Sequence, residues 1–394
     1  MKVFLVAGEP SGDRLGGALM GGLRALRPDV RFEGVGGPEM AAQGLQSLFD
    51  MSELSVMGLA EVLPRYPHLV RRMKETADRA VAMEPDVIVT IDSPDFGLRV
   101  LKRVRAARPA QRTVHYVSPT VWAWRPRRVD KMKGLVDQVL TLFPFEPPHL
   151  EAAGLRADFV GHPVATEPRA GPAETEAFRN AHGLGDASVM LVLPGSRKGE
   201  VSRLAPVFGA AIRAVLSARP DARIVVPAAL PVAGMVTEAV RTWPGSPVIL
   251  DPRGRPLDET LAEKRAAFAA ANVALAASGT VSLELAAQST PMVIAYDMAW
   301  ISRQIIKSML RVDTVTLVNL VSGTRTVPEF LGAACKPQPI SDALTDLLAD
   351  GSTQRDALEA TMDRLGRGGE APGLRAARAV LDGLGQDPRI PGAA

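Results

Sequence analysis

The sequence opens with MKVFLVAGEPSGD (Met1–Asp13), and this stretch decides the fold class. An apolar run of strand type gives way to GEPSGD, and a helical pattern begins at about Arg14. In doubly wound sheets, ligands bind at the carboxyl ends of parallel strands, which is where such a turn lies. The turn therefore predicts a nucleotide-type or sugar-type site. Its acidic, hydroxyl and small residues are the first site candidates: Glu9, Ser11, Gly12 and Asp13.

Short apolar strands alternate with helix-length amphipathic segments along the chain, which is typical of a mostly parallel sheet built from βαβ units. In the first part, strands are expected at Val3–Ala7, Arg31–Val35, Val87–Ile91, Thr113–Val117, Gln138–Leu142 and Asp158–Val160. In the second part, they are expected at Val189–Leu193, Arg223–Val226, Val248–Leu250, Val273–Ala276, Met292–Ala295 and Val315–Leu317. Helices are expected near the end at Asp342–Leu348, Arg355–Leu365 and Leu374–Leu384.

The alternation stops between Val164 and Glu174, where Pro168, Gly171 and Pro172 can neither continue a helix nor pair as a central strand. We place an interdomain linker there, since 394 residues are too many for one core and suit two. The predicted fold class is α/β, with two Rossmann-like, doubly wound parallel-sheet domains facing a cleft. The expected domains are residues 1–165 and 175–345, followed by C-terminal helices at 346–385 and a flexible tail at 386–394.

Composition narrows the class of protein further. The apolar runs stay short of the roughly 18 to 20 residues of a membrane-spanning helix, and the first strand lacks the basic region of a signal peptide. A single cysteine, Cys335, rules out an internal disulfide and fits a reducing compartment. The five histidines are dispersed, so no built-in metal site is expected. The formal charge of +3 does not by itself predict nucleic-acid binding.

The second domain carries two loops that each lead from a strand into a helix. The first, LPGSRKGE, begins at Leu193, and the second, ASGTVSLE, begins at Ala277. Backbone N–H groups at a helix start, together with a guanidinium, can clamp a diphosphate, and a carboxylate one turn later can accept hydrogen bonds from a ribose. Ordinary turns with a helix cap are the alternative. The nucleotide-site candidates are Gly195, Ser196, Arg197, Ser278, Gly279, Thr280 and Glu284.

In the first domain, a strand ends in TIDSPDF, and Asp92 follows its last apolar residue. A carboxylate at this place can remove a proton from a hydroxyl nucleophile, with Glu9 and Asp13 nearby on the same sheet edge. Asp95 is equally well explained as a helix cap. Next comes HYVSPTVWAWR, which begins at His115. Its Trp122 and Trp124 can stack on a sugar ring or pack in a core.

Taken together, these motifs resemble the lipid-A-disaccharide synthase family. The resemblance rests on GEPSGD, VMGLAEVL, IDSPDF, HYVSPTVWAWR, PFE, VGHP, LPGSRKGEV and ASGTVSLE, which occur in this order from Gly8 to Glu284. It implies a two-domain glycosyltransferase of the GT-B type that needs no metal or other cofactor. The implied reaction moves 2,3-diacylglucosamine from UDP to the 6-hydroxyl of 2,3-diacylglucosamine 1-phosphate, with inversion, giving the lipid A disaccharide 1-phosphate and UDP.

The resemblance also assigns roles to individual residues. It places Asp92 at the position of the catalytic base and links Arg197 and Asn319 to activity or nucleotide binding. Asn319 is not indicated by any local pattern. UDP is expected on the second domain, with its uracil and ribose near Ser278–Glu284 and its diphosphate at Gly195–Arg197. Arg197 and the helix ends would stabilise the departing diphosphate.

Both implied substrates carry acyl chains, so the first domain needs an apolar surface. The segment from Leu54 to Leu63 supplies one, or is instead a buried helix. Arg125 begins a basic cluster that can meet anionic lipid or the acceptor phosphate, or simply face water. We expect a cytoplasmic protein on the inner-membrane surface, no nucleic-acid partner, and a homodimer as an open question. The acceptor-side and lipid-side candidates are Ser11, Gly12, Val56, Met57, Leu59, Leu63, Trp122, Trp124 and Arg125.

Three alternatives share parts of this pattern. A UDP-sugar epimerase would use the same nucleotide site and carboxylates without an acyl surface. A glycosyltransferase with a soluble acceptor would show no dependence on lipid. A nucleotide-sensing protein without catalysis would tolerate the loss of Asp92.

Overall fold

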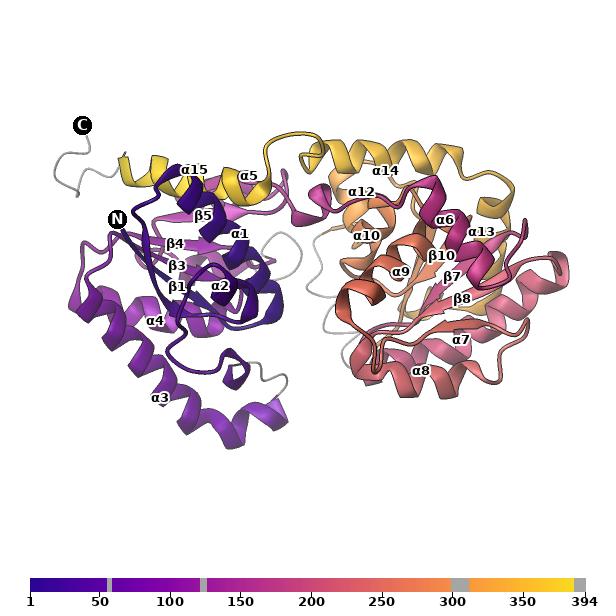
Figure 1. The fold of residues 1–394 in the computed structure, drawn as a ribbon, viewed down its shortest axis with the longest axis horizontal. Coiled ribbons are helices and arrows are strands. Elements are labelled where there is room, and N and C mark those ends of the chain that lie inside the picture. The colour runs from indigo at the N-terminus through magenta and orange to yellow at the C-terminus, as the bar shows by residue number, and fades with distance from the viewer. Residues whose placement is uncertain (55–58, 121–125, 299–311, 386–394) are drawn as a thin grey trace. The chain divides into compact units, whose positions relative to one another are not determined.

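The computed structural model describes residues 1–54, 59–120, 126–298 and 312–385, and the side chains of 59–64, 126 and 127 also lie outside the described part. The chain forms two compact units. The first contains Met1–Thr166 together with the chain from Gly368 onward, and the second contains Glu167–Arg367. Each unit is built around its own sheet, with helices on both faces (Figure 1).

The first unit has a six-stranded parallel sheet in the order β2-β1-β3-β4-β5-β6. Its central strands are buried along their whole length, which explains their continuous apolar sequences. The strands are β1 (Lys2–Ala7), β2 (Arg31–Val35), β3 (Val87–Ile91), β4 (Thr113–Tyr116), β5 (Gln138–Thr141) and β6 (Arg156–Phe159).

Proline occupies the first turn of most helices in this unit, where its missing N–H costs nothing and its fixed φ suits the helix. The α-helices are α1 (Pro10–Leu26), α2 (Pro38–Ala42), α3 (Leu59–Met83), α4 (Pro94–Ala107), α5 (Pro147–Glu151) and α15 (Pro372–Gly385). Short 3₁₀ helices lie at Met51–Glu53, Pro126–Lys131 and Pro163–Thr166.

The last described helix, α15, belongs to the first unit although it follows the whole second unit in sequence. It packs along α1 through two glycines: a Cβ at Gly22 would lie 2.5 Å from the Gly373 carbonyl oxygen, and one at Gly373 would lie 2.5 Å from that of Ala18. Gln138 on β5 also donates its side-chain N–H to the Ala379 carbonyl (2.8 Å). The segment 346–385, grouped above as C-terminal helices, is therefore divided between the units. The tail expected at 386–394 lies outside the described residues.

The second unit has a six-stranded parallel sheet in the order β12-β11-β10-β7-β8-β9. The strands are β7 (Val189–Leu193), β8 (Arg223–Pro227), β9 (Val248–Leu250), β10 (Val273–Ala276), β11 (Met292–Tyr296) and β12 (Glu329–Leu331). The prediction of a strand at Val315–Leu317 is wrong, because helix α12 begins at Leu317 and the edge strand β12 begins only at Glu329. A short apolar run fits either element, so its pattern alone could not decide.

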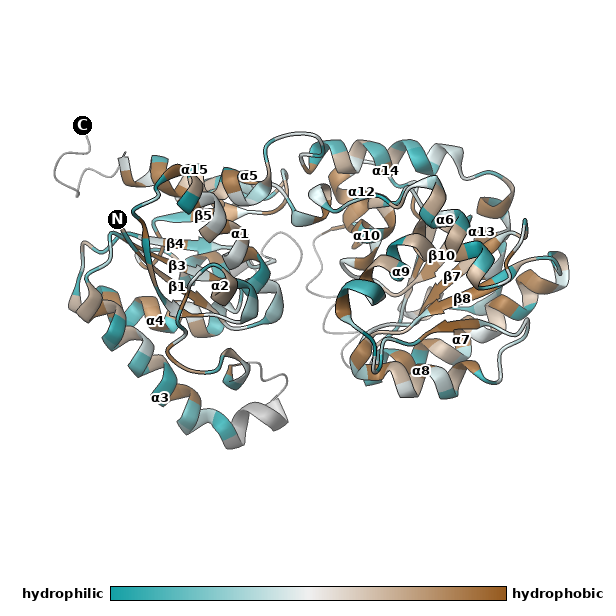
Figure 2. Cartoon of the chain, viewed as in Figure 1, coloured by the Kyte–Doolittle hydropathy of each residue, from teal (hydrophilic) through white to brown (hydrophobic). Residues whose placement is uncertain are grey.

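The helices of this unit cover a strongly apolar sheet, as Figure 2 shows for β7, β8 and β10. α7 alone among the described helices is long and apolar enough to span a membrane, but its Val201, Leu204, Phe208 and Ile212 are fully buried in the core. The α-helices are α6 (Pro172–Ala181), α7 (Lys198–Ala218), α8 (Ala233–Val240), α9 (Leu257–Ala270), α10 (Val281–Ala287), α12 (Leu317–Ser322), α13 (Pro337–Ala349) and α14 (Ser352–Arg364). Short 3₁₀ helices lie at Leu230–Val232 and Gly332–Ala334.

Each sheet reverses its strand order at one point, and a binding site is expected there. In the first unit, β1 and β3 are neighbours while β2 lies outside β1, so the turns after Ala7 and Ile91 lie at the same sheet edge. In the second unit, β7 lies between β8 and β10, so the turns after Leu193 and Ala276 meet in the same way. The predicted doubly wound architecture is confirmed, and it brings the quoted loops together in pairs.

Candidate active site

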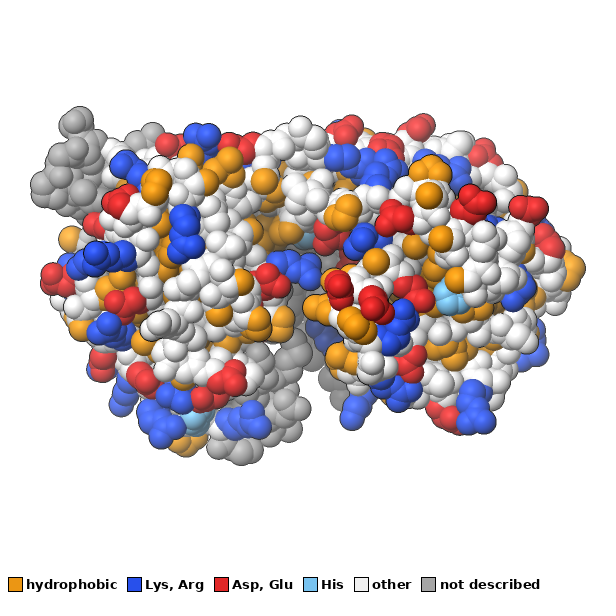
Figure 3. Space-filling model, viewed as in Figure 1, with side chains coloured by type: hydrophobic (Ala, Val, Ile, Leu, Met, Phe, Trp, Pro, Cys, Tyr) orange, Lys and Arg blue, Asp and Glu red, His pale blue; other side chains and the backbone are white. Residues whose placement is uncertain are grey.

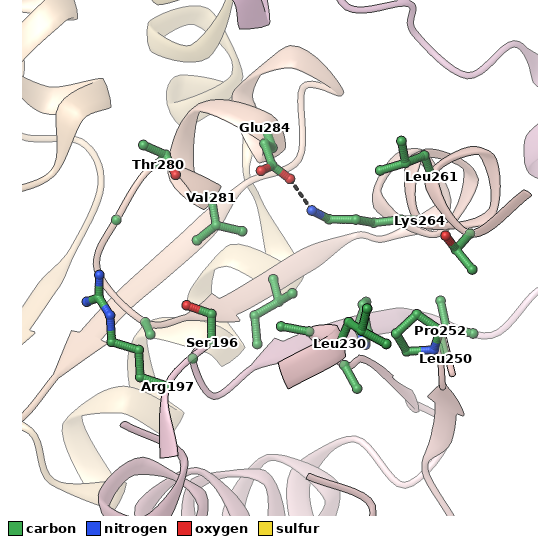
Figure 4. Close-up of a pocket in the computed structure, with 18 of the residues that line it drawn as sticks. Ser196, Arg197, Leu230, Leu250, Pro252, Leu261, Lys264, Thr280, Val281 and Glu284 are labelled. Carbon is green, nitrogen blue, oxygen red and sulfur yellow. Dashed lines mark hydrogen bonds and ion pairs between the residues drawn. The ribbon is translucent and has the colours of Figure 1, made fainter. Parts of the chain in front are cut away.

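The second unit has a pocket of about 560 Å³ at the carboxyl ends of β7 and β10 (Figure 4). The loops after these two strands form one end, where Arg197 and Thr280 lie, and α9 and the loops after β8 and β9 form the other. The pocket lining includes every local nucleotide-site candidate from the sequence: Gly195, Ser196, Arg197, Ser278, Gly279, Thr280 and Glu284.

Glu200 organises the loop between β7 and α7. Its Oε2 accepts hydrogen bonds from the backbone N–H groups of Ser196 (3.0 Å) and Arg197 (3.2 Å), and its Oε1 accepts one from the Arg197 guanidinium (3.2 Å). Gly195 has a φ of 116°, and a Cβ there would lie 2.6 Å from the Glu200 Cβ. This position therefore needs glycine both for its backbone conformation and for the space that Glu200 occupies.

The buried Glu200 changes the expected use of this loop. The sequence suggested that its backbone N–H groups clamp a diphosphate, but two of them already bind the chain's own carboxylate. The Arg197 side chain is 65% exposed and can still contact an anion. The Tyr296 hydroxyl donates a hydrogen bond to Glu200 Oε1 (3.4 Å). The pKa of Tyr296 is raised, mainly by its partial burial and in addition by the negative charge of Glu200.

The loop between β10 and α10 keeps its amides open. The N–H groups of Ser282 and Leu283 donate to the carbonyls of Gly279 and Thr280, while those of Thr280 and Val281 have no partner within the described residues. Gly279 has a φ of 157°, and no atom lies within 4 Å of where its Cβ would be. Small residues and open amides allow an anionic group to approach the backbone closely, so this loop is the better anion site of the two.

Beyond these loops, the pocket lining combines aliphatic side chains with the carboxylates of Asp251 and Glu263. Glu284 on α10 forms an ion pair with Lys264, which extends from α9 toward it (Figure 4). Further along lie aliphatic side chains, some of them exposed although they are large. These aliphatic residues are Leu230, Leu250, Pro252, Leu257 and Leu261.

In the first unit, the turn after β3 holds its residues in a strained backbone conformation. Asp92 has a φ of 52° and Ser93 a φ of 40°, a left-handed region that non-glycine residues seldom occupy. Asp92 accepts hydrogen bonds from the Ser11 hydroxyl at Oδ2 (2.9 Å) and from the Ser93 N–H at Oδ1 (2.9 Å). Glu9 accepts one from the Ser93 hydroxyl (3.3 Å). Strain of this kind concentrates at functional sites.

Gly12 allows α1 to approach this turn, because a Cβ there would lie 3.2 Å from the Ile91 carbonyl oxygen. The structure thus brings Glu9, Ser11, Gly12 and Asp92 together. The cap alternative for Asp95 does not apply: Ser93 is the N-cap residue of α4, and Asp95 lies exposed in its first turn.

Asp13 has a different position from the one expected of a catalytic acid. Its carboxylate is 2% exposed and accepts hydrogen bonds from the backbone N–H groups of Gly37 (2.7 Å), Glu39 (2.9 Å) and Met40 (3.1 Å). These groups open helix α2, whose N-cap residue is Gly37. Both oxygens are therefore engaged in capping a helix, and these contacts favour a structural role for Asp13.

Asn319 lies outside the pocket lining and is 1% exposed. Its side-chain amide donates to the Val327 carbonyl (2.9 Å), and its Oδ1 accepts from the Val327 N–H (3.0 Å). It thereby joins α12 to the chain that leads into β12. Val56, Met57, Trp122, Trp124 and Arg125 lie outside the described residues, as do the side chains of Leu59 and Leu63 on α3.

Sequence reasoning gave no role to Glu200 or Lys264. A signal for Glu200 existed, since a glutamate at the third position of a helix can accept a hydrogen bond from the backbone N–H of the N-cap residue, here Arg197. Lys264 had none, because it lies twenty residues from Glu284 in an ordinary helix. Within the described residues, no three His, Cys, Asp or Glu side chains gather as metal ligands.

Two doubly wound parallel sheets with loop pairs at their switch points define a protein of the GT-B fold type. A solved structure with this fold is UDP-GlcNAc 2-epimerase from Neisseria meningitidis bound to UDP-GlcNAc, with a TM-score of 0.59, 12% identity, and coverage of 98% of this chain and 99% of that one. At this identity, the likeness shows the fold alone.

The sequence model of the lipid-A-disaccharide synthetase family matches residues 3–371. The lipid-A-disaccharide synthase of Ruegeria pomeroyi is 61% identical over 384 residues, which is 98% of this chain and 96% of the relative. That of Rhodospirillum centenum is 46% identical over 387 residues, 97% of this chain and 94% of the relative. The chain therefore belongs to the lipid-A-disaccharide synthase family and is a glycosyltransferase. The resemblance noted from the motifs is confirmed, and the epimerase alternative is not favoured.

Proposed function

We propose that this enzyme transfers 2,3-diacylglucosamine from UDP to the 6-hydroxyl of 2,3-diacylglucosamine 1-phosphate, releasing UDP and the β-1,6-linked lipid A disaccharide 1-phosphate. The observation that carries the proposal is the family match over nearly the whole chain. Both the sugar-nucleotide pocket and the strained Asp92 turn agree with it.

For the donor, we propose that the diphosphate lies between the Arg197 guanidinium and the open amides of the loop after β10. Its negative charge would be met there by a cation and by the N-terminal end of α10. The ribose would then lie at Glu284, and the uracil between the aliphatic side chains at the far end of the pocket. This order places the uracil at the end where the aliphatic side chains lie, away from Arg197 and Thr280. It places the diphosphate nearer Thr280 than the sequence alone suggested.

For the acceptor, we propose Asp92 as the general base. Its carboxylate would take the proton of the 6-hydroxyl as that oxygen attacks the anomeric carbon from the face opposite UDP, so the configuration inverts. The bond from the anomeric carbon to the diphosphate oxygen breaks as the new bond forms. The hydrogen bonds from Ser11 and Ser93 would orient Asp92, and Glu9 would hold Ser93. Arg197 would stabilise the charge that develops on the leaving diphosphate.

We further propose that the protein works at the cytoplasmic face of the inner membrane, because both substrates carry acyl chains. Charged side chains of both signs are interspersed over the face of each unit seen in Figure 3, which agrees with the small net charge of +3. A homodimer remains a separate hypothesis. Flotation with anionic vesicles tests the membrane association, and light scattering, which measures the molecular mass in solution, tests the homodimer.

The reaction is tested with purified enzyme in detergent, UDP-2,3-diacylglucosamine and 2,3-diacylglucosamine 1-phosphate. Mass spectrometry should detect the disaccharide phosphate with wild type. Asp92→Asn should lower kcat by about 10²- to 10⁴-fold, the usual contribution of a general base, with UDP affinity unchanged. UDP release without disaccharide, or a C2-epimerised donor, would contradict the proposed reaction. Retention of most activity by Asp92→Asn would remove it as the base.

A further inference from the structure

The pocket of the second unit, proposed above to hold an anion, is lined by more acidic than cationic side chains. Four carboxylates belong to its described lining, against the two cationic side chains of Arg197 and Lys264. A diphosphate adds further negative charge, so each carboxylate needs compensation. The four carboxylates are Glu200, Asp251, Glu263 and Glu284.

Three of these carboxylates are each engaged by more than one hydrogen bond or ion pair. Glu200 is engaged by two backbone N–H groups and by Arg197, three residues away. Asp251 accepts three side-chain hydrogen bonds from Arg253, which hold its pKa below its usual range. Glu263 pairs with Arg255 and lies 3.3 Å from His182.

Glu284 is compensated differently. Within the described residues, the Glu284 side chain pairs with Lys264 alone, through its Oε2 atom. Both side chains line the pocket, and Lys264 is 34% and Glu284 33% exposed. The partner comes from a separate helix, α9, and Figure 4 shows the lysine reaching across to the glutamate. The Lys264 ammonium also lies 5.3 Å from the centre of the Phe268 ring.

We infer that Lys264 makes Glu284 compatible with a nucleoside diphosphate by neutralising its charge while leaving its second oxygen free. An unpaired carboxylate at this place would repel the diphosphate of the ligand. With Lys264 bound at Oε2, Oε1 still accepts a ribose hydroxyl, and the pair as a whole is close to neutral. Lys264 is therefore a positioning residue for nucleotide binding. The inference rests on the proposed placement of UDP in this pocket.

The charge argument separates Lys264 from a residue that merely shapes the pocket. If it acts by neutralisation, its loss weakens UDP binding much more than uridine binding, because uridine carries no phosphate. If Lys264 only shapes the pocket, its loss lowers the affinity for UDP and for uridine by the same factor. The effect must also depend on Glu284, because without that carboxylate no charge is left to neutralise.

The test is a double-mutant cycle of Lys264→Met and Glu284→Gln. UDP affinity is measured by calorimetry and uridine affinity by ligand-observed NMR. Lys264→Met should weaken UDP binding by about tenfold or more and uridine binding by less than about threefold. In the Glu284→Gln background, the same substitution should change UDP affinity by less than about threefold. Lys264→Arg should retain the affinity of wild type.

Lys336→Met is a matched control, since Lys336 is outside the pocket lining, and it should bind UDP like wild type. Thermal melts show whether each variant folds. Equal losses for UDP and uridine, or an undiminished effect of Lys264→Met beside Glu284→Gln, would overturn the inference. Absence of UDP binding by wild type would overturn it together with the proposed donor, whereas UDP binding without transfer contradicts only the reaction.

Discussion

Replacing Asp13 decides whether this carboxylate holds the fold or takes part in catalysis. Its oxygens accept hydrogen bonds from three backbone N–H groups at the start of α2, at 2.7, 2.9 and 3.1 Å. Asp13→Ala leaves all three without their acceptor. Asp13→Asn preserves Oδ1, which binds Gly37 and Met40, but it turns a donating NH₂ group toward the N–H of Glu39.

The magnitude follows from these contacts. A hydrogen bond to a charged group contributes about 1.5–3 kcal/mol, and water that reaches the exposed side of α2 recovers part of the loss. We expect Asp13→Ala to destabilise the first unit by about 3–5 kcal/mol and Asp13→Asn by about half as much. For a unit of this size, 1 kcal/mol corresponds to about 2–4 °C in Tm, so the alanine variant should melt roughly 6–20 °C lower.

Differential scanning calorimetry measures the Tm of each variant. The disaccharide assay measures kcat at a temperature below the unfolding transitions of the variants and of wild type. Asp95→Ala serves as the stability control: this first-turn acid of α4 is 85% exposed, so its Tm should change little. The folded fraction of both Asp13 variants should keep the kcat of wild type. A variant that melts like wild type and yet loses kcat by about a hundredfold or more would refute the capping role and return Asp13 to the chemistry.

Three further results are expected. Gly373→Ala should destabilise the first unit by about 1–3 kcal/mol in calorimetry, because its Cβ meets a backbone oxygen of α1 at 2.5 Å. Burial lowers the pKa of His115 and of His162 to about 4. The unfolded chain therefore binds more protons than the folded chain between about pH 6.5 and pH 4. The free energy of unfolding, measured in urea, should decrease as the pH is lowered through that window, by up to about 1.4 kcal/mol per pH unit for each histidine. Glutamine at either position should reduce this slope. Ser11→Ala should lower kcat by about threefold to tenfold while leaving UDP affinity unchanged, since it removes one hydrogen bond that orients Asp92; an unchanged kcat would contradict that orienting role.

Much of the fold was predictable because it depends on local sequence. Buried parallel strands are short apolar runs and several helices begin at proline, so eleven of the twelve described strands lie where the alternation predicts them. The exception, β12, is a three-residue edge strand. The loops after β7 and β10 were also found, because glycine and hydroxyl residues that follow an apolar run are typical of a turn between a strand and a helix.

Short stretches of neighbouring residues were enough to establish the class of fold, the family and the loops that carry the candidate sites. The roles of the individual acids became visible only in the folded chain. Asp13 and Asp92 both follow strands at the same sheet edge, yet Asp13 meets backbone N–H groups 24 to 27 residues away, while Asp92 faces Ser11. The same holds for Lys264 beside Glu284 and for α15 against α1. The role of a carboxylate depends on which donors surround it in space, and distant segments bring those donors to it.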